Sequence, residues 1–81
     1  MMLQYDPEAD ALFARIRVIT PEEVGGGDQI DGRRIVHYDR AGEVVGLEFL
    51  DASMGIDLNG LPCADELREA LHSLGRLTPA A

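Results

Sequence analysis

The sequence predicts an α+β fold, a small antiparallel β-meander of about four strands followed by a C-terminal helix. Short apolar runs alternate with polar residues over the first 50 positions, turn residues separate these runs, and leucines near the end recur at helical spacing. The chain of 81 residues predicts one domain, 1–81, with the meander at about 3–50 and the helix at about 64–74.

The small size predicts a thin core. A domain of this length buries only about 60% of the surface that its unfolded chain exposes. Cys63 is the single cysteine, so no disulfide adds stability. We therefore expect a homo-oligomer, with a dimer favoured, because self-association buries additional surface.

The first hairpin is predicted from strands at 3–5 and 11–18, with Asp6 and Pro7 in the first two positions of a type I turn. Alternation divides the second strand into two faces. The face predicted to be buried carries Leu12, Ala14, Ile16 and Val18, and the other carries Phe13, Arg15 and Arg17. The following segment, 20–28, contains Gly25-Gly26-Gly27 and is predicted to be a mobile surface loop.

A second hairpin is predicted from strands at 35–38 and 44–50, joined by the turn 39–42. Val45, Leu47 and Phe49 are predicted to share one face, and Val44, Glu48 and Leu50 the other. Because both faces carry apolar residues, both are expected to be covered. Gly46 inside this strand indicates a bulge or a close approach of another group to the backbone.

The C-terminal helix is predicted at 64–74 because Leu67, Ala70, Leu71 and Leu74 fall at helical spacing. It is the internal candidate to cover one sheet face. Gly75 ends the helix, and His72 in its last turn has a structural role at the negative end of the helix dipole. Residues 78–81 are predicted to be a frayed tail.

The charge excludes several kinds of partner. Seven basic residues, all arginine, oppose fifteen acidic ones, which gives a net charge of −8. Such a chain repels phosphate backbones and anionic membranes, so neither nucleic acid nor a membrane is expected as a partner. The sequence shows neither a signal peptide nor a transmembrane segment, which predicts a cytoplasmic protein.

Two segments resemble a known family. They are Tyr5–Phe13, with the sequence YDPEADALF, and Ile35–Ser53, with the sequence IVHYDRAGEVVGLEFLDAS. Together they resemble domain-of-unknown-function family 2283 over about 3–53. The resemblance implies a small prokaryotic protein with a β-meander and brings no established activity, cofactor or catalytic residue. It also implies a partner-binding role, since members are sometimes encoded beside small toxin-like proteins; His37 replaces the acidic or small residue common there.

One constellation suggests chemistry. Asp39, Glu48 and Asp51 are candidates to converge with His37 at one end of the central hairpin, and a histidine beside carboxylates suits acid/base catalysis or metal binding. The alternative is a set of surface and turn-capping polar groups. These four residues are the candidate site, and no catalytic, metal or cofactor-binding residue is assigned beyond them.

Other motifs favour structural roles. Asp6, Glu8 and Asp10 have the spacing that opens a calcium loop, but Ala11 and Arg17 replace its required glycine and acid. Ser53 and Cys63 are candidate nucleophiles, but the sequence places no histidine base beside either of them. The alternative for Cys63, which lies near a helix start, is a reactive thiol. The triple glycine lacks the strand, helix and lysine of a phosphate loop.

Two classes of function remain. The leading hypothesis is a protein–protein interaction module that binds itself or a small basic protein, as the antidote to a basic toxin would, through a sheet edge or the helix face. The alternative is a small acid/base or metal-dependent enzyme that uses the candidate residues. The enzyme hypothesis requires a pocket, which in so short a chain predicts a site at a dimer interface. No cofactor is predicted.

Overall fold

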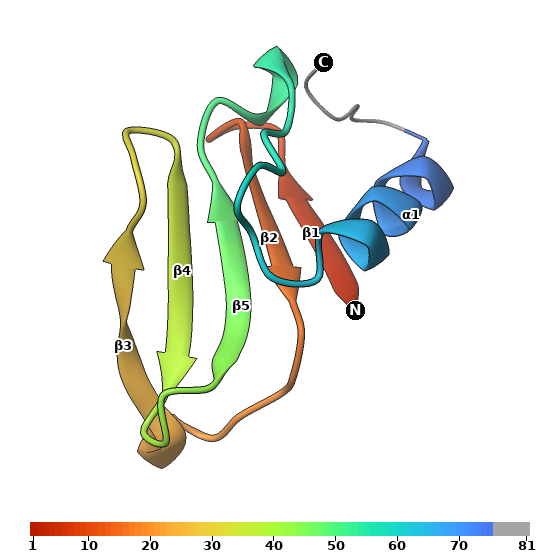
Figure 1. Ribbon diagram of the computed structural model, residues 1–81. Coiled ribbons are helices and arrows are strands. Elements are labelled where there is room, and N and C mark those ends of the chain that lie inside the picture. Colours follow the sequence, from red (N-terminus) through yellow and green to blue (C-terminus); the bar gives the residue numbers. More distant parts are fainter. Residues whose placement is uncertain (76–81) are drawn as a thin grey trace.

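The computed structural model describes residues 1–75 (Figure 1). Its elements are β1 (Met2–Asp6), β2 (Ala11–Arg15), the 3-10 helix η1 (Pro21–Glu23), β3 (Val24–Gln29), β4 (Arg34–Asp39), β5 (Val44–Phe49), the 3-10 helix η2 (Ala52–Met54) and α1 (Ala64–Leu74). The strands form one antiparallel sheet in the order β1-β2-β5-β4-β3. The predicted α+β class is confirmed, with five strands where about four were expected. The tail predicted at 78–81 lies outside the described residues.

The additional strand is β3, which occupies the segment predicted to be a mobile loop. It pairs with β4 from Gly26 opposite Tyr38 to Gln29 opposite Ile35. A Cβ atom on Gly25 would lie 2.0 Å from the carbonyl oxygen of Asp39, so only glycine allows the two backbones to approach this closely. The prediction of a mobile loop was wrong. It relied on the low strand propensity of glycine, whereas pairing with β4 determines the conformation of this segment.

The first hairpin is confirmed, but β2 ends at Arg15, earlier than predicted. The N–H groups of Ile16 and Arg17 both donate to the carbonyl of Val45, at 2.9 and 3.3 Å. This shared acceptor interrupts the regular ladder. Val18, predicted on the buried face, is consequently 74% exposed.

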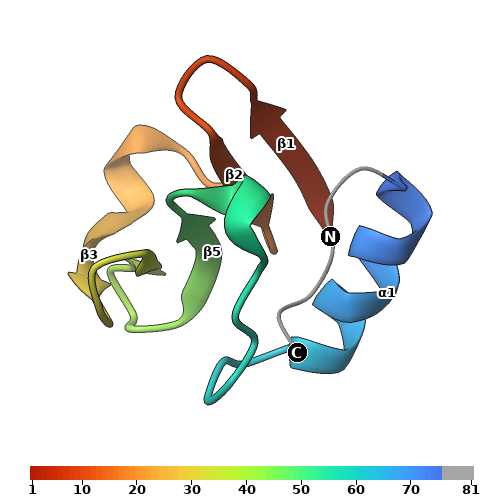
Figure 2. The same cartoon turned by 90° about the horizontal axis from the view of Figure 1, so that it is seen from above.

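The core lies on one side of the sheet, which we call the inner face (Figure 2). Helix α1 has its predicted bounds, and its Leu67 and Leu71 are fully buried against this face. Gly75 ends the helix in the left-handed conformation, with φ 68°. The buried cluster comprises Leu12, Ala14, Val36, Leu47, Phe49, Ala52, Ile56, Leu58, Leu61, Leu67 and Leu71.

Two arginines hold the irregular segment 50–63, which supplies four of these buried side chains. Arg33 donates from Nη2 to two backbone carbonyls of the segment, at 2.9 and 3.0 Å. Arg34 donates from Nη1 to two more, at 3.3 and 2.6 Å. The segment therefore covers the inner face with four of its carbonyl groups bonded to arginine, although it has little regular secondary structure.

Candidate functional site: a groove on the outer sheet face

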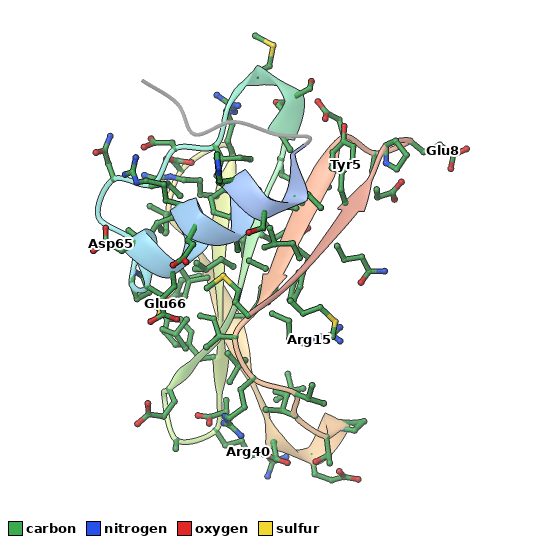
Figure 3. The ribbon with its side chains drawn as sticks, turned by 90° about the vertical axis from the view of Figure 1, so that its right-hand side faces the viewer. Tyr5, Glu8, Arg15, Arg40, Asp65 and Glu66 are labelled. Carbon is green, nitrogen blue, oxygen red and sulfur yellow. The ribbon has the colours of Figure 1, made fainter. Side chains whose placement is uncertain are left out.

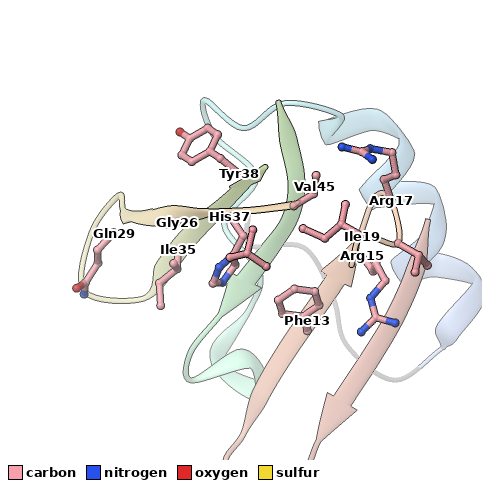
Figure 4. Close-up of a pocket in the computed structure, with 13 residues that line it drawn as sticks. Phe13, Arg15, Arg17, Ile19, Gly26, Gln29, Ile35, His37, Tyr38 and Val45 are labelled. Carbon is pink, nitrogen blue, oxygen red and sulfur yellow. The ribbon is translucent and has the colours of Figure 1, made fainter. Parts of the chain in front are cut away.

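The opposite side of the sheet, the outer face, carries a groove of about 750 Å³ (Figure 4). Within residues 1–75, α1 and the segment 50–63 lie on the inner face and leave this groove open. The groove is lined by Phe13, Arg15, Arg17, Val18, Ile19, Val24, Gly26, Gly27, Gln29, Ile35, His37, Tyr38 and Val45. Its volume is in the range of small-molecule and cofactor sites.

Two aromatic rings form the floor of the groove because two glycines make room for them. A Cβ atom on Gly46 would lie 2.7 Å from Cζ of Phe13, and one on Gly27 would lie 3.2 Å from Nδ1 of His37. The rings of Phe13 and His37 lie with their centroids 5.4 Å apart and their planes tilted by 42°. Gly46 is thus the position of close approach that the sequence indicated.

A bulge in β5 changes the predicted faces of that strand. The register shifts between His37 and Tyr38, so that His37 pairs with Gly46 and Tyr38 pairs with Val44. Val45 is left without a partner and lines the groove, while Val44 packs against the core. The predicted grouping of Val45 with the inner residues of β5 is therefore wrong, because a bulge residue breaks strict alternation.

The groove is basic although the protein is acidic. Its lining contains two arginines and a histidine, and no aspartate or glutamate. Arg17 pairs with Asp39 and, at 3.3 Å, with Glu23. The guanidinium of Arg15 lies 5.9 Å from the ring centroid of Phe13 and forms no ion pair with any described residue. Arg15 is therefore a cation available to a ligand.

Of the four predicted site residues, the structure brings two together. Nε2 of His37 lies 3.1 Å from Oε1 of Glu48, and both side chains are about one third exposed. Glu48 pairs with Ile35, so it reaches His37 along a diagonal of the sheet. This pair stands at the edge of the groove floor.

The expected convergence with Asp39 and Asp51 does not occur. Asp39 ends β4 and Asp51 follows the end of β5, and because the strands are antiparallel these positions lie at opposite ends of the sheet. The buried carboxylate of Asp39 accepts the N–H groups of Ala41 and Glu43, both at 2.9 Å, and so shapes the β4–β5 turn. Asp51 is exposed and precedes η2 in the left-handed conformation.

The acidic hairpin turn has a structural role. Asp10 accepts the Tyr5 hydroxyl at 2.6 Å, and Ser53 donates its N–H at 2.9 Å and its hydroxyl at 2.6 Å. Hydrogen bonds from Ser53, then from Tyr5, hold the pKa of Asp10 below its ordinary value. The carboxylate of Asp6 accepts the N–H of Glu8 at 3.0 Å. These groups join the first turn to η2.

No set of three or more His, Cys, Asp or Glu side chains within 1–75 is arranged to hold a metal ion. Cys63 is half-buried and occupies the N-cap position of α1 with φ 57°. His72 is exposed in the last turn of the same helix, which is the position that the sequence predicted.

Sequence reasoning missed the groove itself. Two signals were available. Phe13 and Arg15 were predicted on the face opposite the buried one, and Gly46 was recognised as a glycine inside a strand. Sequence reasoning did not predict that β2 and β5 are neighbours with Phe13 opposite Glu48. Without that pairing the ring of Phe13 cannot be placed over Gly46.

The model of a protein family of unknown function, DUF2283, matches residues 2–53. The chain belongs to the DUF2283 family. This match confirms the resemblance found in the sequence, and its range includes all five strands and every residue that lines the groove. Helix α1 lies outside it. No curated protein and no solved structure matches the chain. None of the described helices is sufficiently long and apolar to cross a membrane.

Proposed function

We propose that this DUF2283 protein is a protein–protein interaction module that forms a homodimer through the outer face of its sheet. The observation that carries the proposal is the open groove, whose apolar lining stays in contact with solvent. Val18 and Val24 at its rim are 74% and 54% exposed. Contiguous exposed apolar surface is typical of interaction sites, and a stable interface buries about 800 Å² on each partner.

The domain also gains stability from such an interface. A side chain of the size of valine contributes roughly 1.5–3 kcal/mol when it passes from full exposure to full burial. Strands that carry apolar residues on both faces need cover on both faces. The core covers only the inner face, so a partner on the outer face would supply the missing layer. A second copy provides this cover with the same apolar rim.

The proposal is tested by light scattering and sedimentation of the purified full chain. Val18→Asp places a charge on the rim, and Met54→Asp is its matched control, since Met54 is 76% exposed and lies on η2, outside the groove. We expect a wild-type dimer, at least about tenfold weaker association for Val18→Asp and no change for Met54→Asp. A monomeric wild type, or equal effects of both changes, contradicts the proposal.

A small basic protein is the second partner that the charge favours, as in an antitoxin-like complex in the cytoplasm. The net charge is −8, and α1 exposes Asp65 and Glu66 (Figure 3). Glu69 of the same helix is also exposed. Opposite charge accelerates association and weakens with salt. A stoichiometric basic partner that is released by salt and lost in Glu66→Lys/Glu69→Lys supports this role, and salt-insensitive binding contradicts it.

A small acid/base enzyme is the alternative, and the His37–Glu48 pair beside a groove favours it. A carboxylate that bonds one imidazole nitrogen orients the ring for proton transfer at the other. A panel of ester, amide and phosphoester substrates tests this function. Turnover by wild type that is lost in His37→Gln supports an enzyme, and equal background rates contradict it.

A further inference from the structure

We infer that Arg15 of each protomer pairs with Glu22 of the partner subunit across the two-fold axis of the homodimer. The inference rests on the proposed function, because it specifies the contacts of that same interface. Four features carry it: the basic groove, the absence of an ion pair at Arg15, the carboxylate of Glu22 on the rim and the symmetry of a homodimer.

Arg15 is the cation that the fold leaves available. The guanidinium of Arg17 is neutralised by Asp39 and Glu23, whereas Arg15 has no carboxylate within ion-pair distance among residues 1–75. It is partly buried and lies over the ring of Phe13. A cation held against an aromatic ring has lost part of its hydration and rotamer freedom, so it binds a carboxylate at reduced cost.

Glu22 is the matching anion on the rim. It lies in η1 between Ile19 and Val24, both of which line the groove. Glu22 is exposed and forms no ion pair with a described residue, in contrast to its neighbour Glu23. Hydrogen bonds from its own backbone and from Thr20 lower the pKa of Glu22 and keep it a carboxylate that has no cationic partner among residues 1–75. The segment 18–24 therefore presents this carboxylate between exposed apolar side chains, which complements an apolar groove whose lining contains no acidic residue.

Symmetry makes this pairing reciprocal. In a two-fold interface, a residue that contacts a second residue on the other subunit is contacted in the same way in return. Because Arg15 lines the groove and Glu22 lies on its rim, the same face of each protomer supplies both members of the pair, which gives two ion pairs per dimer. A basic protein in this groove would instead leave Arg15 facing like charge, which is unfavourable.

The test is a charge swap measured by sedimentation equilibrium on the full chain. We expect Arg15→Glu and Glu22→Arg each to weaken dimerisation by about tenfold or more, and the double variant to recover to within about threefold of wild type. Arg68→Glu and Glu69→Arg on the exposed side of α1 are the matched controls, expected to change the dimer constant less than twofold. The milder Arg15→Gln is used if Arg15→Glu unfolds, as monitored by circular dichroism.

The outcomes separate the two ideas. A dimer that is insensitive to both single changes, or a double variant as weak as the two singles combined, overturns the pairing and leaves the proposed homodimer in place. A wild-type chain that stays monomeric overturns both. The pairing is supported if the double variant recovers its dimerisation constant and if this constant is lower at high salt than at low salt.

Discussion

The two faces of the sheet are built from the same strands and serve different purposes. On the inner face, Leu12, Leu47 and Phe49 are at most 2% exposed beneath α1 and the segment 50–63. On the outer face, their neighbours Phe13 and Glu48 stay partly exposed, and Phe13 lines an open groove. Stability therefore resides mainly in the inner face, and the outer face is available for recognition.

The largest effect is expected from Leu71→Ala, which removes a fully buried side chain between α1 and the inner face. We expect a loss of about 2–5 kcal/mol in the free energy of unfolding, measured by urea denaturation. Leu74→Ala, at a residue 39% exposed on the same helix, should cost much less. Equal losses would show that the helix does not seal the core.

A smaller loss is expected from Gly46→Ala, since the added Cβ would meet Cζ of Phe13 at 2.7 Å. Moving the ring should cost about 1–3 kcal/mol of stability. Gly32→Ala is the control, because nothing lies within 4 Å of its Cβ position. Phe13→Leu should relieve part of the loss in Gly46→Ala, and full additivity of the two changes would contradict this account of the groove floor.

Acid should weaken the connection between the first turn and η2. The pKa of Asp10 lies below its ordinary value of 3.8 in the folded chain, so its contribution to stability is fully present above that value. The contribution is lost as the pH falls through the lower folded pKa. Asp10→Asn should flatten this acid limb in pH-dependent urea denaturation. Glu8→Gln is the control, because the carboxylate of Glu8 bonds no described residue. This change should leave the loss of stability at acid pH unchanged.

The smallest effect is expected from the His37–Glu48 pair on the outer face. Because both side chains are about one third exposed, His37→Gln or Glu48→Gln should each change stability by less than about 1 kcal/mol. A double-mutant cycle in urea measures the coupling directly. A coupling of several kcal/mol would mean that the outer face also supports the fold.

Local patterns predicted the elements that depend on neighbours in sequence. The helix bounds, the two hairpins and the inner alternation of β2 all followed from spacing and turn residues. The glycine-rich β3 did not, because its strand conformation comes from pairing with β4. Gly46 indicated a bulge or a close approach in β5, but the position of the bulge at Val45 did not follow from the sequence, because it depends on the register across two strands.

The candidate site shows the same division. Sequence reasoning selected His37 and Glu48, which the sheet brings to 3.1 Å, and also Asp39 and Asp51, which strand direction carries to opposite ends. The hydrogen bonds from Arg33 and Arg34 to the segment 50–63 were not predicted. Their acceptors are backbone carbonyls, which no side-chain pattern reveals.

The sequence by itself determined the α+β class, the helix, the acidic charge and the family, because these depend on composition, local periodicity and motif order. Only the tertiary structure decided that β2 lies beside β5 and that one face of the sheet stays open. Those features arise from pairings between residues more than 30 positions apart, such as Phe13 with Glu48, which local spacing does not specify.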